Sequence, residues 1–371
     1  MTIEKKLNIA VIYGGVSPEH EISRKSANKI ISSLSKKKYN IFPVYINKEG
    51  AWTLYENYNR DLRNFDWEKN GFEVSLSTNH NFSGLIKLVD YNFNLLDIDL
   101  IIPALHGENG EDGTIQGLLE ISCIPYVGCG VLSSSISMDK SMMRIIASNF
   151  NVLQTEYLFL SDIDFKNNKK KILNNIKKDI NYPCFVKPCN LGSSIGINKA
   201  KNEEEILDMI KIAFYYDRKI LIEKEIKGRE LECAVMGSAI DNEIDISGVG
   251  ELNLKSEFYD YDAKYKDKNS KVIIPAKLER SIINNIKKLS RKIFRIFDCS
   301  GLSRIDFFLE GNTNKIFFNE LNTFPGFTNI SMYPMLWESE GISTSMLLDK
   351  LIDISLKRKE NKEKKIWQID Q

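Results

Sequence analysis

The 371-residue sequence predicts a multidomain α/β protein whose first domain contains a parallel sheet. The first third of the chain alternates short apolar runs with an amphipathic segment, and strand–helix–strand order of this kind is typical of parallel sheets. Two of the apolar runs end in glycine-containing loops, as expected at the C-terminal ends of such strands. The length also exceeds what one ordinary hydrophobic core accommodates, so we expect two or three domains.

The first region is predicted to contain three strands and a helix. Residues 7–13, 41–46 and 100–105 are short apolar runs that favour strands. After the first of them, apolar residues from Ile22 to Leu34 recur at helical spacing. Residues 48–95 are polar, aromatic and irregular, and we expect them to form an insertion.

The remainder of the chain is predicted to form two further α/β regions. Helices are expected at 169–178, 203–216 and 279–297, and strands at 184–187, at 221–226 and in two runs that end near Glu320. A mobile loop is expected at 253–274, and a solvated helix end or disordered tail at 357–365. The predicted domains are 1–126, 127–220 and 221–360, followed by a tail at 361–371.

The composition argues against nucleic acid and membranes as partners. Basic and acidic residues nearly balance, at 51 against 50, so no excess charge attracts a polyanion or an anionic surface. No stretch approaches the ~20 apolar residues of a membrane helix, and the N-terminus lacks the apolar core of a signal peptide. The six cysteines show no CxxC pair or zinc spacing, which favours buried free thiols. We expect a cytoplasmic protein.

The segment GGVSPE, which ends at Glu19, connects the first strand to the first helix. Backbone amides at a helix start suit an anion or a polar ligand, although a plain strand–helix turn is favoured when this segment is taken alone. The two common nucleotide-binding fingerprints, GxGxxG and GxxxxGK[ST], are both absent.

The segment HGENGEDG, residues 106–113, follows a predicted strand directly. It combines His106 with three carboxylates and three glycines at the C-terminal end of that strand. We interpret it as functional, although a lone histidine is a weak signal.

A third motif combines FVKP with the small-residue run GSSIG. An apolar strand that delivers Lys187 into a glycine–serine loop can place backbone amides and a positive charge around phosphate oxygens. The alternative is a β-hairpin with a surface lysine.

The fourth motif lies at the ends of two consecutive predicted strands. Alternation places Arg304 and Asp306 on one face, and Glu320 and Asn322 on one face of the next strand. If the strands pair, three oxygen ligands and an arginine converge, and such ligands suit a Mg²⁺ ion that also binds phosphates. The alternative is a structural cluster of salt bridges.

Together these motifs resemble the ATP-grasp superfamily, and specifically the D-alanine–D-alanine ligases. The resemblance runs from the first strand to about residue 350. It rests on seven ordered segments: GGVSPEHEIS, ALHGENGEDGTIQG, MDKSMMR, FVKPCNLGSSIGI, EFYDYDAKY, SRIDFF and NELNTFPGFTNISMYP. The resemblance implies an ATP-grasp fold of three α/β domains, with ATP between the second and third, and a homodimer formed through the N-terminal region.

The resemblance also implies a nucleotide and metal site. The positions that it places on ATP are Lys140, Lys187, Glu223, Lys224, Ile226 and Glu230. The two lysines would contact phosphates, the next three would line the adenine pocket, and the last would bind the ribose. Asp306, Glu320 and Asn322 would hold two Mg²⁺ (or Mn²⁺) ions.

The substrate positions follow in the same way. Glu19 would take the ammonium group of the first D-alanine and be linked through Ser193 to Tyr265, with His106 beside that substrate. Lys264 would arrive on the mobile loop to close the site. A further set would hold the oxyanion and the second D-alanine: Arg304 and the Gly326 amide for the former, Ser331 and Met332 for the latter.

The activity implied is ATP-dependent formation of D-alanyl-D-alanine, through an acyl phosphate, for peptidoglycan synthesis. A carboxylate is a poor electrophile, so ATP must activate it, and the negative charges gathered in that step need cations. The loop sequence around Tyr265 resembles the form that takes D-alanine rather than D-lactate or D-serine. Three alternatives remain: another ATP-grasp ligase, a non-catalytic nucleotide-binding regulator, and a dinucleotide oxidoreductase.

Overall fold

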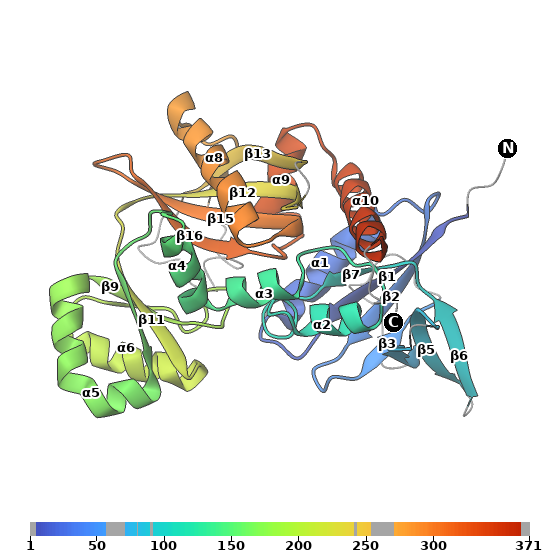
Figure 1. Cartoon of the computed structure of the whole chain (residues 1–371), viewed down its shortest axis with the longest axis horizontal. Helices are drawn as coiled ribbons and strands as arrows, with labels where there is room; N and C mark the ends of the chain where they lie inside the picture. Colours follow the sequence, from blue (N-terminus) through green and yellow to red (C-terminus); the bar gives the residue numbers. More distant parts are fainter. Residues whose placement is uncertain are drawn as a thin grey trace, which may run out of the picture.

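Three sheets organise the chain, seen here in a computed structural model that describes residues 5–56, 71–79, 81–89, 92–240, 243–253 and 271–364. A seven-stranded sheet has the order β6-β5-β4-β3-β2-β1-β7, a four-stranded sheet β10-β9-β11-β8, and a five-stranded sheet β14-β13-β12-β15-β16. Figure 1 shows the four-stranded sheet at one end, the seven-stranded sheet at the other, and the five-stranded sheet between and above them.

The seven-stranded sheet contains the predicted parallel strands. Its elements are β1 (Leu7–Gly14), β2 (Tyr39–Ile46), β3 (Trp52–Leu54), β4 (Phe72–Leu76), β5 (Gly84–Val89), β6 (Asn92–Asp97) and β7 (Leu100–Ala104), with helices α1 (His20–Ser33) and α2 (Thr114–Ile121). Strand β1 pairs in parallel with both β2 and β7. Because it is covered on both faces, six consecutive residues of β1 are fully buried, which explains its continuous apolar sequence.

The segment 48–95, which we expect to form an insertion, contains β3, β4, β5 and the start of β6. These strands extend the sheet with antiparallel pairs. They are short: β6 is mostly exposed, β3 and β4 each bury one residue, and β5 buries two. Runs of three to six residues give little length over which a period of two can be recognised.

The four-stranded sheet lies in the middle of the sequence. Its elements are β8 (Tyr157–Ser161), α5 (Asp162–Asn175), a π-helical turn η1 (Ile176–Ile180), β9 (Cys184–Pro188), β10 (Asn198–Ala200), α6 (Glu203–Tyr216) and β11 (Lys219–Lys224). The helix predicted at 169–178 begins earlier, because Ser161 and Asp164 form a reciprocal cap at its N-terminus. Strand β11 belongs to this sheet, so the chain passes to the next sheet after Lys224.

The five-stranded sheet is antiparallel. It contains β12 (Gly228–Ser238), β13 (Ile244–Asn253), β14 (Lys271–Ile273), β15 (Ser300–Glu310) and β16 (Ile316–Asn322), and it is accompanied by α3 (Val131–Met138), α4 (Lys140–Asn149), α8 (Arg280–Ile296) and α9 (Met332–Ser339). The expected loop at 253–274 includes β14 near its end, and residues 254–270 lie outside the described residues. The predicted domain limits themselves stay predictions.

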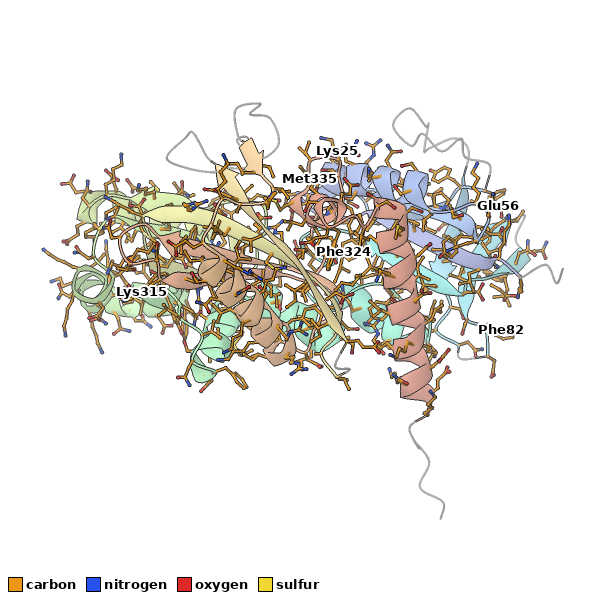
Figure 2. All side chains as sticks on the ribbon, turned by 90° about the horizontal axis from the view of Figure 1, so that it is seen from above. Lys25, Glu56, Phe82, Lys315, Phe324 and Met335 are labelled. Carbon is orange, nitrogen blue, oxygen red and sulfur yellow. The ribbon has the colours of Figure 1, made fainter. Side chains whose placement is uncertain are left out.

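The seven-stranded and five-stranded sheets share one hydrophobic core. Side chains of β1, α1 and β7 pack with Phe324, Phe327, α9 and the C-terminal helix α10 (Thr344–Glu363). Figure 2 shows Phe324 in the middle of the molecule, between the ends marked by Lys315 and Phe82. The four-stranded sheet is packed around a separate core of its own.

The helix end predicted at 357–365 is present through Glu363 but is not simply solvated. Arg358 donates hydrogen bonds to the backbone oxygens of Gly128 (2.6 Å) and Tyr126 (2.9 Å), and so ties α10 to the first region. All six cysteines are free thiols, and five of them are buried, as predicted. In the part of the chain that is described, no helix is both long and apolar enough to cross a membrane.

Candidate active site

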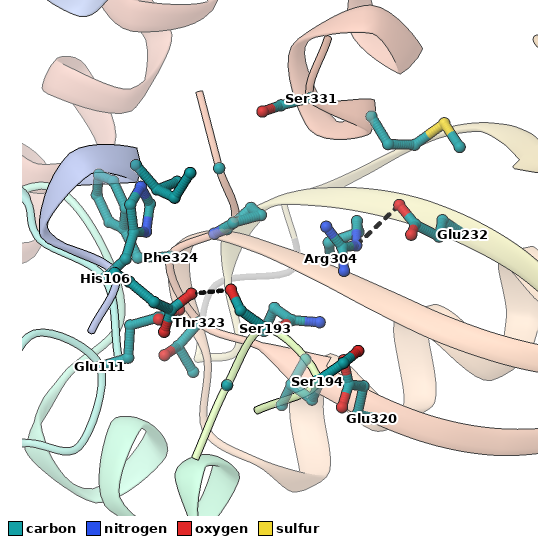
Figure 3. A pocket seen from close by; sticks show the side chains of 18 of the residues that line it. His106, Glu111, Ser193, Ser194, Glu232, Arg304, Glu320, Thr323, Phe324 and Ser331 are labelled. Carbon is teal, nitrogen blue, oxygen red and sulfur yellow. Dashed lines mark hydrogen bonds and ion pairs between the residues drawn. The ribbon is translucent and has the colours of Figure 1, made fainter. Parts of the chain in front are cut away.

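One pocket collects residues from all three sheet regions. Its wall includes the loop after β1, the loop after β7, the start of α4, the loop between β9 and β10, and the segment after β16. Figure 3 shows side chains from these segments pointing toward a common space. The predicted site residues on this wall are Glu19, His106, Lys140, Ser193, Arg304, Glu320, Asn322, Gly326, Ser331 and Met332.

Glu19 is held at the start of α1 by close neighbours. It is 7% exposed, and the Ser193 hydroxyl donates a hydrogen bond to its Oε1, the contact that the sequence predicts. A Cβ atom added at Gly192 would lie 2.8 Å from Glu19 Oε2, so a larger residue there would displace this carboxylate. At Gly107, where φ is +72°, a Cβ would meet the same oxygen. The two glycine-rich loops thus enclose one carboxylate.

His106 is fixed at the end of β7 by hydrogen bonds to α1 and its preceding turn. Its Nε2 lies 2.8 Å from Ser26 Oγ, and its backbone oxygen accepts a 2.9 Å hydrogen bond from Ser17. The Phe327 backbone N–H also donates to Ser26 Oγ, at 3.2 Å. The imidazole therefore connects the first region to the segment after β16, on the pocket wall.

Glu111 is a half-buried pocket residue that the sequence analysis left without a role. The Gly107 backbone N–H donates a 2.7 Å hydrogen bond to its Oε2. Burial, and next the charge of Glu19, raise the pKa of Glu111 to about 8. The segment HGENGEDG indicated a functional loop. It contains three carboxylates, however, and the sequence did not show which of them lines the pocket.

Strands β15 and β16 pair as the oxygen-ligand prediction requires. Arg304 stands opposite Asn322, and Asp306 stands opposite Glu320. Arg304 donates from Nε to Asp306 Oδ1 and from Nη2 to Asp306 Oδ2, both at 2.7 Å. Asn322 Nδ2 donates to Asp306 Oδ2 at 3.0 Å. The four predicted side chains therefore converge.

Glu232 on β12 is a second residue that the sequence analysis missed. It is 2% exposed, lines the pocket, and its Oε2 lies 2.9 Å from Arg304 Nε (Figure 3). Alternation along β12 places it on one face with Glu230, but the register with β15 was needed to bring that face to Arg304.

The basic residues of the site fall into two groups. Lys140 lines the pocket, and its Nζ donates a 2.6 Å hydrogen bond to the backbone oxygen of Leu191, next to the glycine-rich loop. Lys187 instead forms an ion pair with Glu223. Arg144 contacts the other oxygen of Glu223 at 2.7 Å. Burial alone would raise the pKa of Glu223, but the charges of Lys187 and Arg144 lower it to about 2.

The residues predicted for adenine and ribose do not line the pocket that holds Glu19. Lys224 is exposed and lies 3.5 Å from Glu156, and Ile226 is half-buried in the connection between β11 and β12. Glu230 follows on β12 and is half-buried. Lys264 and Tyr265 lie outside the described residues, so their predicted positions are not tested.

The predicted second-substrate residues adjoin one another at the start of α9. Ser331 Oγ accepts a 2.9 Å hydrogen bond from the Thr328 backbone N–H. A Cβ atom added at Gly326 would lie 2.9 Å from that hydroxyl. Met332 is 4% exposed and packs against Gly250 of β13. A polar hydroxyl and an apolar thioether thus line this part of the pocket.

The donor set on β15 and β16 fits a hard divalent cation. Asp306, Glu320 and the amide oxygen of Asn322 offer the oxygen ligands that Mg²⁺ and Mn²⁺ prefer when phosphate oxygens supply the rest. Their register places them on one face of the five-stranded sheet, and Glu320 and Asn322 reach the pocket wall.

Comparison with known proteins agrees with this architecture. A model of the D-ala D-ala ligase N-terminus matches residues 8–129, and one of the D-ala D-ala ligase C-terminus matches residues 146–353. A D-alanine–D-alanine ligase of Caldicellulosiruptor bescii is 47% identical, with 97% of each chain covered. One from Acetivibrio thermocellus is 43% identical over 95% of this chain and 96% of the relative.

Solved structures of the same kind superpose closely. VanG D-Ala:D-Ser ligase from Enterococcus faecalis has a TM-score of 0.85 at 35% identity, covering 95% of this chain and all of that one. The D-alanine–D-alanine ligase from Coxiella burnetii has a TM-score of 0.84 at 32% identity, covering 97% and 96%. The fold and the pocket thus define a ligase with the ATP-grasp fold. Within that class, the chain belongs to the D-alanine–D-alanine ligase family.

Proposed function

We propose that this protein joins two D-alanine molecules into D-alanyl-D-alanine at the expense of ATP, as a step of peptidoglycan precursor synthesis. The observation that carries the proposal is that one pocket has two chemically different sides. Glu19 and Ser193 line one side, and Arg304, Glu320 and Asn322 line the other. A carboxylate suits the ammonium group of an amino acid, while the cationic and oxygen-rich side suits its carboxylate as it is phosphorylated.

The residues divide the chemistry between them. Glu19 would hold the ammonium group of the first D-alanine, so that its carboxylate points toward Arg304. Transfer of the γ-phosphoryl group of ATP would give an acyl phosphate, and the amine of the second D-alanine would displace phosphate from it. Arg304 and the Gly326 amide would hold the oxyanion that develops on the attacked carbonyl. Ser331 and Met332 would receive the second D-alanine.

Nucleotide and metal would be held between the four-stranded and five-stranded sheets. We propose that Lys140 and Lys187 contact phosphates, that Glu223, Lys224 and Ile226 line the adenine pocket, and that Glu230 binds the ribose. Two Mg²⁺ (or Mn²⁺) ions on Asp306, Glu320 and Asn322 would neutralise phosphate charge and orient the γ-phosphoryl group.

The supporting residues would exclude water and fix the geometry. Ser26 holds His106 on the same pocket wall as Glu19. An acyl phosphate would hydrolyse if water entered the pocket, so we propose that Lys264 and Tyr265 close the site. We also propose a cytoplasmic homodimer formed through the N-terminal region. Sedimentation of the full chain as a monomer would contradict the dimer without touching the activity.

The proposal is tested by phosphate release from ATP and Mg²⁺, with the dipeptide identified by mass. The full chain should turn over with D-alanine alone and stay silent with L-alanine. Parallel reactions containing D-alanine with D-serine or D-lactate test the second position, because a relative of similar structure is a D-Ala:D-Ser ligase. A mixed product that outcompetes the D-alanine dipeptide at neutral pH would overturn the second-substrate assignment.

A further inference from the structure

Three carboxylates stand in a row across the five-stranded sheet. Glu232 on β12 is the direct partner of Asp306 on β15, and Asp306 is the direct partner of Glu320 on β16. Directly opposed residues of antiparallel strands share a face, with Cβ atoms about 4.5–5.5 Å apart. Only two members of this row belong to the predicted metal site.

Arg304 is shared between two members of the row. Its Nε and Nη2 donate to both oxygens of Asp306, and Nε also lies 2.9 Å from Glu232 Oε2. The side chains of the three residues are between 2% and 9% exposed, so water screens these interactions little. One guanidinium thus holds two buried carboxylates at once.

A divalent cation on Asp306 and Glu320 would compete with this arrangement. Asp306 uses both oxygens for Arg304, and one of them also accepts from Asn322. A cation bound to the same Asp306 oxygens would repel the guanidinium. It would also occupy the oxygen lone pairs that now accept hydrogen bonds from Arg304. Asp306 and Glu320 then face metal, and Glu232 is the carboxylate that remains beside the single charge of Arg304.

We propose that Glu232 is a positioning residue that keeps the Arg304 guanidinium aimed into the pocket when metal engages Asp306. The inference rests on the proposed function, which gives Arg304 its oxyanion. Glu232 is suited to the task because β12 pairs with β15 without a break from Gly228 to Ser238, which fixes its backbone relative to Arg304. Without Glu232, the Arg304 guanidinium would have neither carboxylate partner once Asp306 had turned to the metal.

The same row could instead make Glu232 a third metal ligand, but the geometry favours the positioning role. Arg304 Nε donates its hydrogen bond to Asp306 Oδ1, while Glu232 Oε2 lies 2.9 Å from the same nitrogen as an ion pair without a hydrogen bond. Release of Asp306 would leave this N–H free to turn to Glu232. Within the residues that the structure describes, no three His, Cys, Asp or Glu side chains converge as a metal site. The two roles make opposite predictions for metal affinity.

The first test compares Glu232→Gln with Glu251→Gln. Glu251 forms a bidentate pair with Arg229 on the same sheet, at 2.6 and 2.7 Å, but does not line the pocket, so it is a matched control. Glu232→Gln should lower kcat about 10–100-fold, as loss of a residue that orients a catalytic group does, with KM for ATP and D-alanine within about threefold. Glu251→Gln should keep kcat, and Glu232→Asp should recover part of it.

Metal binding separates the two roles of Glu232. Mn²⁺ binding to the full chain in the presence of ADP, followed by electron paramagnetic resonance, should be the same in wild type and Glu232→Gln. A tenfold loss of affinity in Glu232→Gln would overturn the positioning role in favour of a ligand. Retention of more than half of wild-type kcat would overturn it as well. In an Arg304→Ala background, Glu232→Gln should change kcat less than twofold, because it acts through that arginine.

A crystal structure of the wild-type chain with Mn²⁺ and ADP provides a test without turnover. The expected result places Asp306 on the metal and Arg304 on Glu232; Arg304 still paired with Asp306, or Glu232 on the metal, would refute the inference. Failure of the wild type to turn over D-alanine while this arrangement is seen would overturn only the proposed substrate. Failure to bind Mn²⁺ and ADP at all would overturn both.

Discussion

Two buried charge clusters, one at the four-stranded sheet and one at the five-stranded sheet, lie beside the proposed nucleotide site. Both combine cationic side chains with carboxylates, but one has more cations and the other more carboxylates. The cationic cluster consists of Arg144, Lys187 and Glu223, with two cations around one carboxylate. The anionic cluster consists of Glu232, Arg304, Asp306 and Glu320, with one cation among three carboxylates. They meet at β16, because Arg144 also donates a 2.8 Å hydrogen bond to the backbone oxygen of Phe318.

The opposite excess charges match the two halves of a metal–nucleotide complex. A phosphate chain carries negative charge and is favoured beside the cationic cluster, whereas a divalent cation is favoured beside the anionic one. Counted by its own members, each cluster has a net charge opposite to the part of the complex that it would face.

The largest effect is expected when the cationic cluster loses its only carboxylate. Glu223→Ala leaves Arg144 and Lys187 buried without their shared partner, and should lower the free energy of unfolding by about 3–5 kcal/mol in urea denaturation. Its matched control is Asp208→Asn in the exposed pair with Lys211, which should cost under about 0.5 kcal/mol. Equal losses in the two variants would show that burial does not decide the strength of these pairs.

The same pair has a defined pH dependence. The folded pKa of Glu223 lies at about 2, below its ordinary value of 4.5, so the pair contributes its full stability above about pH 4.5. That contribution is lost as the pH falls from 4.5 toward 2. Glu223→Ala should therefore unfold with a weaker acid dependence than wild type over this range.

The anionic cluster should respond in activity rather than in stability. Asp306→Asn keeps the size of the side chain but removes a proposed metal ligand, and should lower kcat about 10²–10³-fold in the phosphate-release assay. Because one of three carboxylates around Arg304 becomes neutral, the protein should stay folded. Glu310→Gln, at the end of the same strand, should keep wild-type activity. An unfolded Asp306→Asn would mean that the carboxylate is structural.

These two clusters also mark how far the sequence alone could predict the site. The convergence of Arg304, Asp306, Glu320 and Asn322 was predictable, because period-two alternation fixes which residues share a face of each strand. Glu232 was not, because a third strand joins the row only through its register, and register depends on tertiary pairing.

The fold shows the same limit. Strand β1 and helix α1 have buried faces that leave a clear apolar pattern, and both were predicted within a residue or two of their starts. Strands β3 to β6 are only three to six residues long, so even the alternating burial of β4 is a weak signal, and β6 is mostly exposed. Arg144 lies four residues after Lys140, but only the partner strand β11 makes it part of a charge cluster.

A smaller effect is expected from the carboxyl pair at the other end of the pocket. The pKa of Glu111 is raised to about 8 by burial and by Glu19. Its folded state retains a proton that the unfolded chain has lost, so its contribution to stability falls as the pH rises from about 4.5 to about 8. Glu111→Gln should flatten the fall of melting temperature over this range, whereas Glu108→Gln in the same loop should not. An unchanged slope in Glu111→Gln would refute the assignment.

The smallest effect is expected for the partly exposed ion pair beside the cationic cluster. Asp139 pairs with Lys219 and also accepts hydrogen bonds from the Ser141 and Met142 backbone N–H groups at the start of α4. Asn caps helices as well as Asp does, so Asp139→Asn removes only the charge and should cost under about 1 kcal/mol in urea denaturation. Asp139→Ala loses the cap too and should cost about 1 kcal/mol more. The Asp139 side chain is 17% exposed, against 3% for Glu223. If Asp139→Asn lost as much stability as Glu223→Ala, solvent access would not set the strength of ion pairs in this protein.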